Sequence, residues 1–178
     1  MPSPLSTLPL ETLLFEKCWV DCVQWHLEDE IRRPGLDPVQ GMELKHRIDR
    51  SNQKRTDLVE QLDDHFLAWL GTISTADRSI PLNTESPAWA VDRLSILALK
   101  RYHMQEESIR PSAGLDHRER CAAKLQVLEE QRTDLTGSIQ TLFDEVLHGR
   151  RRVKLYRQMK MYNDPKLNPA LYRQPGKE

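Results

Sequence analysis

Two histidine–carboxylate pairs have residue types and a spacing that could do chemistry. His26 and Asp29 are three residues apart, and His103 and Glu106 repeat this spacing farther along the chain. Residues three apart share one face of a helix, so each pair could ligate a metal ion or form a hydrogen bond. Di-metal helical bundles use the opposite order, Glu-x-x-His, with a carboxylate from each of two further helices. The reversed order favours hydrogen-bonded pairs, and we expect no metal at this first polar belt.

The residues expected at the same level on other helices also argue against a metal. Glu43 could supply a further carboxylate from a second helix, but the matching position on a fourth helix is Arg120. A cation at a ligand position opposes metal binding, whereas buried polar groups are stable when they are hydrogen-bonded.

A second polar belt centres on arginine. Arg55 interrupts an apolar seam with coiled-coil spacing, and Arg132 interrupts a similar seam. A buried arginine is costly unless it meets an anion. The chain offers four carboxylates for this purpose, namely Glu16, Asp57, Asp92 and Asp134. A bound anionic ligand is the alternative, and the sequence leaves both interpretations open.

The start of a helix at Pro87 supports the ligand alternative. Ser86 can cap the exposed backbone amides, and amides at a helix start attract anions. Arg93 lies two turns into the same helix. The candidate ligand-binding residues are Asn52, Arg55, Asn83, Glu85, Ser86, Asp92, Arg93, Lys160, Tyr162 and Asn163.

An acidic run, Asp57-x-x-Glu60-x-x-Asp63, indicates a different chemistry. Carboxylate clusters of this kind hold Mg²⁺ in helical enzymes that hydrolyse nucleotide pyrophosphates. A solvated acidic helix face is the simpler interpretation, and we prefer it. The sequence has no glycine-rich phosphate loop, no nucleophile elbow and no Cys/His cluster with metal-binding spacing.

Composition limits the class of protein. The chain has 178 residues, of which 30% are charged, and its formal net charge is −1. This balance gives no support to nucleic-acid binding driven by charge. No apolar run is long enough to span a membrane, no basic leader precedes the first helix, and three cysteines without a Cys-x-x-Cys motif suit a reducing compartment. We therefore expect a single cytoplasmic domain, residues 1–178, with no nucleic-acid partner.

Local signals predict helices throughout and no strand. Pro34-Gly35 and Gly149 are typical helix ends, and Ser86-Pro87 is a typical helix start. The predicted helices cover about residues 9–33, 38–71, 87–109, 115–148 and, as a short basic helix before an extended tail, 150–161. The third is apolar nearly all round, which places it at the centre of the fold.

The chain also contains an internal repeat at an offset of 77 residues. Arg55-Thr56-Asp57-Leu58 recurs as Arg132-Thr133-Asp134-Leu135, and His26 recurs as His103. The repeat predicts two similar helical hairpins, at about residues 9–71 and 86–148, and residues 150–178 are an addition to them. The predicted fold class is all-α, an up-down four-helix bundle with both hairpin turns at one end.

Five segments together resemble a bacterial family known only as domain of unknown function 4254 (DUF4254). They are residues 24–29 (QWHLED), 48–58 (IDRSNQKRTDL), 83–87 (NTESP), 92–100 (DRLSILALK) and 160–165 (KMYNDP). One departure is Ala88, where the family pattern has glycine. The resemblance implies an all-helical cytosolic protein without an established catalytic residue, similar to proteins found near envelope-polysaccharide genes.

Three functions from different classes fit these observations. The first is binding of an anionic small molecule, such as a nucleotide sugar or sugar phosphate, at the second polar belt. The second is a hydrolase or transferase that uses Asp92, Glu85 or His26 as acid or base, with an acidic Mg²⁺-binding cluster. The third is an interaction module, including a homodimer. No cofactor is identified by the sequence.

Overall fold

A computed structural model describes residues 8–70, 77–158, 161 and 164–172. The helices are α1 (Leu10–Glu30), α2 (Pro38–Leu70), α3 (Pro87–Ile109), α4 (Leu115–Leu147) and the single turn α5 (Pro169–Tyr172). The described residues form no β-strand, only an isolated bridge between Leu82 and Arg152. The all-α fold class is therefore confirmed.

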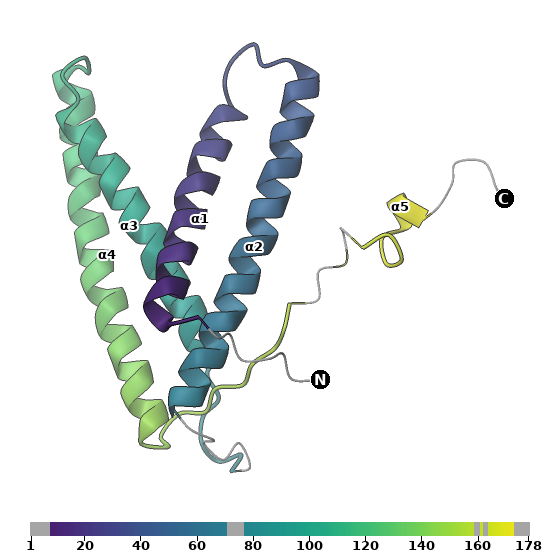
Figure 1. Ribbon diagram of the computed structural model, residues 1–178. Coiled ribbons are helices and arrows are strands. Elements are labelled where there is room, and N and C mark those ends of the chain that lie inside the picture. Colours follow the sequence, from purple (N-terminus) through teal and green to yellow (C-terminus); the bar gives the residue numbers. More distant parts are fainter. Residues whose placement is uncertain (1–7, 71–76, 159–160, 162–163, 173–178) are drawn as a thin grey trace.

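The long helices form two antiparallel hairpins, α1–α2 and α3–α4, whose turns lie at the same end of the molecule (Figure 1). Helix α3 packs against α4 most extensively, and it also contacts α2 and α1. No other long helix packs so broadly on all three neighbours, so the central position expected for residues 87–109 is confirmed.

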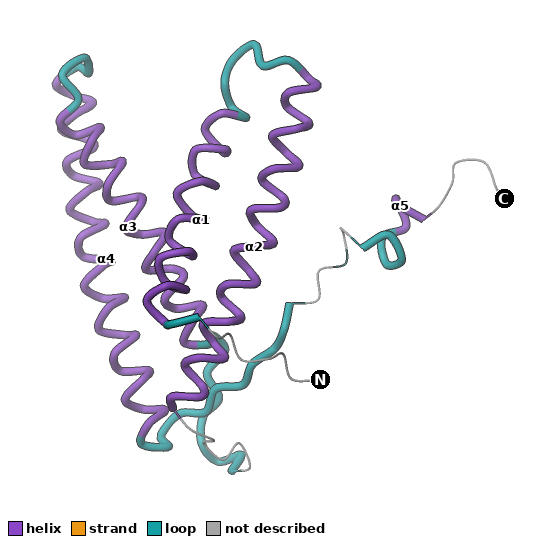
Figure 2. Tube along the Cα trace, in the orientation of Figure 1, coloured by secondary structure: helices purple, strands orange, loops and turns teal. Residues whose placement is uncertain are grey.

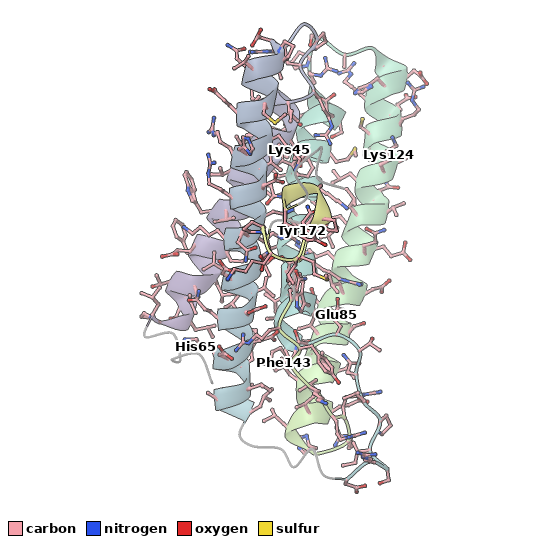
Figure 3. The ribbon with its side chains drawn as sticks, turned by 90° about the vertical axis from the view of Figure 1, so that its right-hand side faces the viewer. Lys45, His65, Glu85, Lys124, Phe143 and Tyr172 are labelled. Atoms are coloured by element: carbon pink, nitrogen blue, oxygen red, sulfur yellow. The ribbon has the colours of Figure 1, made fainter. Side chains whose placement is uncertain are left out.

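The two hairpins converge at the end opposite the turns. Their shared core there includes Leu13, Leu62 and Ala88, all fully buried, and Phe66 packs edge-to-face on Phe143 with ring centroids 5.1 Å apart. Toward the turns the hairpins diverge. In Figure 3, Lys45 on α2 and Lys124 on α4 stand at a similar height on opposite sides of the gap. The bundle is therefore open at its turn end.

The helix starts follow their capping residues. Ser86 accepts a hydrogen bond from the backbone N–H of Trp89, with Pro87 at the first helical position. The Asp37 carboxylate accepts from the N–H groups of Val39 and Gln40 at the start of α2. These side chains satisfy amides that have no partner inside the helix, which fixes where each helix begins.

Equivalent elements of the two hairpins are 77 residues apart. Helices α1 and α3 begin at Leu10 and Pro87, and α2 and α4 both contain 33 residues that begin and end at this offset. Three contacting pairs also differ by 77, namely Cys18 with Ser95, His26 with His103, and Phe66 with Phe143.

The basic helix expected at residues 150–161 is wrong for the part that the structure describes. Gly149, with a φ of 68°, ends the last turn before it, and the chain then continues as a loop beside α2 (Figure 2). The backbone of Arg152 pairs instead with Pro81 and Asn83, and Val153 is buried against Leu142 and Val146. These tertiary contacts outweigh the helix propensity of a short, strongly basic segment.

None of the described helices is both long enough and apolar enough to cross a membrane.

Candidate functional site

Four charged side chains meet inside the region where the hairpins converge. Lys17 and Asp21 come from α1, Arg55 from α2 and Asp92 from α3. The Lys17 ammonium lies 2.5 Å from Asp21 Oδ2 and 2.8 Å from Asp92 Oδ1. Arg55 donates through Nε to Asp92 Oδ1 at 2.9 Å and through Nη2 to Asp92 Oδ2. Lys17, Asp21 and Asp92 are at most 3% exposed. We call these four residues the buried charge cluster.

The cluster is electrically balanced, because two cations face two carboxylates. Ions are costly to bury, and removing one partner from such a set leaves an uncompensated charge. The chain thus supplies the counter-charge of Arg55 itself. Of the four carboxylates considered from the sequence, Asp92 is the partner, and Asp21 joins it at 3.4 Å from Arg55 Nε.

Arg55 is the member of the cluster that also reaches solvent. About 24% of its side chain is exposed. Within the described part of the chain its Nη1 donates to no protein acceptor, while Nε and Nη2 both bind Asp92. The carboxylate thus holds the guanidinium in one orientation with one nitrogen free. Arg55 lines two clefts.

The larger cleft, of about 600 Å³, lies between α2 and α4 over α3. Its lining residues are Arg55, Asp92, Arg93, Ile96, Leu97, Lys100, Gln131, Asp134, Leu135 and Ser138. We call it the basic cleft because, outside the balanced buried charge cluster, two cations, Arg93 and Lys100, line it with one carboxylate, Asp134. A second hollow of about 570 Å³ shares Asp134 and Ser138 with it and extends to Asn83.

The smaller cleft, of about 340 Å³, is lined mainly by α1. Its lining residues are Asp21, Gln24, Trp25, Glu28, Asp29, Arg32, Arg55 and Ile96. We call it the acidic cleft, because three carboxylates face two arginines. The two clefts share Arg55 and Ile96, so they adjoin each other.

The amides at the start of α3 already hold an anion, and that anion belongs to the protein. Asp63 on α2 accepts from the Ala88 N–H at 2.9 Å and from the Ser86 hydroxyl at 2.5 Å. Burial raises the pKa of the Asp63 carboxyl, against the lowering effect of these two hydrogen bonds. Ser86 and the helix start therefore join α2 to α3, and the anion-binding geometry expected there is occupied by a side chain.

Arg93 and Glu85 form an ion pair near the basic cleft. Arg93 Nε lies 2.9 Å from Glu85 Oε1, and the Arg93 side chain is 66% exposed. Asn83 donates to the backbone carbonyl of Glu85 at 2.6 Å, which shapes the loop before α3. In Figure 3, Glu85 lies between α2 and α4, nearer the converging end than Lys45 and Lys124.

The ten candidate ligand-binding residues are therefore only partly brought together. Arg55, Asp92 and Arg93 line the basic cleft, and Asn83 lines its extension. Asn52 is half-buried on α2, and neither hollow includes it. Lys160, Tyr162 and Asn163 lie outside the described residues. Arg132 is exposed, so the expectation of a second arginine in the core is wrong.

The first polar belt does gather near the turns. The His103 ring stacks on Trp25 with centroids 4.7 Å apart and meets His26 edge-on at 6.0 Å. His103 Nδ1 lies 3.0 Å from Glu106 Oε2, so the expected hydrogen bond is present, but the pair is not buried as expected because Glu106 is 53% exposed. Asp29 instead lines the acidic cleft. The described residues contain no group of three or more metal-ligand side chains that could hold an ion.

The acidic run on α2 has separate protein partners. Asp57 accepts from Gln53, and Glu60 accepts from the backbone N–H of Gln158 at 2.9 Å. Asp63 binds the start of α3, as described above. These carboxylates therefore serve three different contacts.

A Cys–His–Glu chain joins α3 to α4 near the turns. His117 Nε2 lies 2.8 Å from Glu107 Oε2 and 3.4 Å from the Cys121 sulfur. In a nucleophile–base–orienter relay the histidine uses both ring nitrogens. Here one nitrogen faces both neighbours, so the geometry is that of a structural contact. Hydrogen bonds from Arg110 and His117 lower the pKa of the Glu107 carboxyl.

Sequence reasoning missed Lys17, Asp21, Asp63 and Lys100. A signal existed for the first two, because Lys17 and Asp21 are an i, i+4 pair on a helix face that also carries Leu13 and Val20. Asp63 was assigned to a solvated acidic face, yet it is only 4% exposed. No local pattern distinguishes it from Asp57 or Asp64.

Comparison with known proteins gives a family and no function. The chain has no significant match among curated proteins or among solved structures. A family model, described as a protein of unknown function (DUF4254), matches residues 11–155. That range contains α1 except its first residue, α2 to α4, the buried charge cluster and the lining of both clefts. The chain therefore belongs to the DUF4254 family.

Proposed function

We propose that this protein binds a small anionic metabolite, of the sugar phosphate or nucleotide sugar class, in the basic cleft. The observation that carries the proposal is Arg55. Its guanidinium is held by Asp92 through Nε and Nη2, and the side chain, about 24% exposed, lines both clefts. A guanidinium fixed before binding loses little conformational entropy when it receives a phosphate.

The rest of the lining suits the same class of ligand. Lys100 and Arg93 add positive charge at the side of the cleft, where a phosphate is attracted. Gln131 and Ser138 offer hydrogen bonds for hydroxyl groups, and Leu135 offers an apolar surface for a ring face. A volume of about 600 Å³ lies within the usual range for small-molecule sites.

The contacts favour binding over acid–base catalysis. Asp92 receives Lys17 and Arg55, and Glu85 receives Arg93. A catalytic carboxylate needs a lone pair aimed at the substrate proton, and these two direct theirs at protein cations. We place the function in the bacterial cytoplasm, in envelope-polysaccharide metabolism, and this setting rests on the family resemblance alone.

Isothermal calorimetry with glucose 1-phosphate tests the proposal, with and without Mg²⁺. We expect saturable binding that Lys100→Gln weakens about tenfold, as the loss of one close phosphate contact implies. Lys124→Gln, an exposed residue of α4 two turns nearer the hairpin turn than Gln131 and outside the cleft lining, is the matched control and leaves the affinity unchanged. Equal effects of both substitutions, or no binding of any member of a sugar phosphate and nucleotide sugar panel, would contradict the site. Turnover of the ligand that depends on Mg²⁺ would favour the enzyme alternative.

We also propose that the two hairpins arose by duplication and fold as one domain, residues 1–178. The common offset of 77 residues in helix bounds and in three contacting pairs supports this. Superposition of residues 10–70 on 87–147 should align α1 with α3 and α2 with α4 without a gap.

A second copy of the chain is the partner we propose for the outer face of α1. Phe15 and Trp19 lie one turn apart on this face and are 69% and 61% exposed. In an antiparallel α1 pair centred between Cys18 and Trp19, the carboxylate of Glu11 on each copy faces His26 of the other. This pairing of a hydrogen-bond acceptor on each copy with an imidazole on the other favours a second copy over an unrelated partner.

A further inference from the structure

The basic cleft continues into the second hollow of about 570 Å³, which we call the polar extension. The two spaces share Asp134 and Ser138 on α4, and the extension reaches Asn83 in the loop before α3. One face of α4 therefore forms a continuous wall of both spaces from Gln131 to Glu145, which is about 21 Å long by the rise of an α-helix. A ligand that fills both spaces is elongated along α4.

The polar extension differs from the basic cleft in its chemistry. Thr133 and Thr141 donate their hydroxyl protons to backbone carbonyls one helical turn earlier, which leaves both hydroxyl oxygens as acceptors. The Asn83 side chain donates through its nitrogen, and its oxygen remains an acceptor. The arginine of this lining, Arg151, is neutralised by Glu145 at 2.8 Å from Nε. The extension thus offers acceptors to hydroxyl groups and little attraction to a phosphate.

Asp134 stands where the two spaces meet. Within the part of the chain that the structure describes, its exposed carboxylate takes part in no hydrogen bond and no ion pair. Such a carboxylate repels a phosphate, but it accepts strong hydrogen bonds from hydroxyl groups. Arg93 and Lys100 attract a phosphate on the other side of this point. Asp134 therefore marks the place where a bound ligand changes from an anionic group to a hydroxyl-bearing one.

Gly137 keeps the wall of the polar extension open. A β-carbon built on this residue would meet no atom within 4 Å, so the helix backbone here faces free space. Glycine in a helix interior lowers stability relative to alanine, and it allows a ligand to approach the backbone closely. Its position in the wall of a hollow suits such an approach.

We propose that the ligand of the basic cleft is a nucleoside diphosphate sugar, and that its sugar ring lies in the polar extension. The diphosphate is received by Arg55, Arg93 and Lys100, the sugar hydroxyls donate to Asp134 and to the acceptors beyond it, and the ring lies against the backbone of Gly137. This inference rests on the proposed binding of an anionic metabolite in the basic cleft. It selects the member of that class that fills both spaces.

Calorimetric titration of the full chain with UDP-glucose and with UDP tests the inference, because the two probes differ by the sugar. We expect UDP-glucose to bind at least tenfold tighter than UDP. Gly137→Leu fills the extension with a residue that favours a helix, so it should weaken UDP-glucose about tenfold and UDP less than twofold. Thr136→Leu, at an exposed neighbour outside both linings, is the matched control and should leave both affinities unchanged.

Asp134→Asn adds a readout of opposite sign for the two probes. It should weaken UDP-glucose several-fold, because an acceptor of the sugar hydroxyls loses its charge, and it should leave UDP binding unchanged or tighten it, because a like charge is removed. Equal weakening of both probes by Asp134→Asn or by Gly137→Leu would overturn the inference.

Failure of this inference and failure of the basic cleft are distinguishable. Lys100→Gln should weaken both nucleotides alike. Equal affinities for UDP and UDP-glucose that both depend on Lys100, or binding of glucose 1-phosphate without binding of UDP-glucose, would overturn the polar extension and leave the function proposed for the basic cleft standing. Binding of none of these three ligands would overturn both.

Discussion

Arg55 connects the interior of the protein to its surface. Its two bonds to Asp92 belong to the buried charge cluster, and its side chain, about 24% exposed, lines both clefts. A buried ionic cluster is weak evidence for stability, because apolar residues of similar volume often stabilise a core as well or better. Charged residues at core positions break the usual sequence pattern of a helical protein, and such exceptions are expected at functional sites. The cluster therefore makes more sense as a support for Arg55 than as a stabilising device.

Separate substitutions of Arg55 and Arg93 distinguish an arginine that supports the protein interior from one that only lines the cleft. Arg55→Met should lower the free energy of unfolding by about 3 kcal/mol, because Asp92 and Asp21 would then share only Lys17. Arg93→Met should change it by less than about 0.5 kcal/mol, because its pair with Glu85 is exposed. Urea denaturation measures both. A loss for Arg93→Met as large as that for Arg55→Met would contradict this account.

Asp63 makes stability depend on pH. Burial is the largest influence on its carboxyl and raises the pKa above the ordinary value of 3.8. A raised pKa means that folding favours the protonated form, so the contribution to stability is complete below pH 3.8 and is lost as the pH rises through the folded-state pKa.

The variant Asp63→Asn keeps an acceptor for the Ala88 N–H and cannot ionise. Relative to the wild type, it should therefore become more stable as the pH rises from about 4 to 7. Unfolding free energies of both proteins at four pH values in this window check the slope. The prediction is contradicted if the difference in unfolding free energy between Asp63→Asn and the wild type stays constant over this pH range, or if it changes in favour of the wild type.

Local signals were reliable at the scale of helices. Ser86-Pro87 predicted the start of α3 because capping is decided by neighbours in the sequence, whereas Pro34-Gly35 placed the end of α1 three residues too late, since the helix stops at Glu30. The segment after Gly149 failed for the opposite reason, since pairing of Arg152 with residues 81 and 83 is invisible in a local window. Lys17 and Asp21 were missed because the apolar residues around them concealed a charge pair that only α3 completes.

Gly149, two residues after α4, and Gly137, inside α4, test how this helix ends. Gly149 has a φ of 68°, which costs a residue with a side chain about 1 kcal/mol, although there is open space around it. Gly137 lies inside the helix with equally open surroundings, so alanine there should add about 0.5–1 kcal/mol. Gly149→Ala should thus lower the melting temperature and Gly137→Ala raise it. Shifts of the same sign would show that the helix end is misassigned.

At the scale of the whole molecule, the angle between the hairpins could not be read from the sequence. The seam pattern of α4 predicts a closed bundle, yet Leu125, Leu128, Leu135 and Ile139 are only half-buried. Burial concentrates near Phe66 and Phe143, where the hairpins converge. Packing density is a property of all helices together, and helical periodicity carries no information about it.

The exposed face of α1 yields a prediction about oligomeric state. Sedimentation velocity at high micromolar concentration should show a dimer for the wild type and a monomer for the double variant Phe15→Ser, Trp19→Ser. Val127→Ser is the control, because Val127 on α4 is also exposed, at 53%, and lies outside the proposed interface. A wild type that stays monomeric, or a dimer that persists in the double variant, would contradict the proposed homodimer interface.

Arginine side-chain NMR during a titration with glucose 1-phosphate tests the central claim most directly, because it observes Arg55 without altering the buried charge cluster. The Arg55 signals, assigned from their loss in Arg55→Lys, should shift saturably with the dissociation constant found by calorimetry. Those of Arg120, exposed near the turns and paired with Asp116, should not move. Saturated binding that leaves the Arg55 signals in place would contradict the claim that its guanidinium receives the ligand.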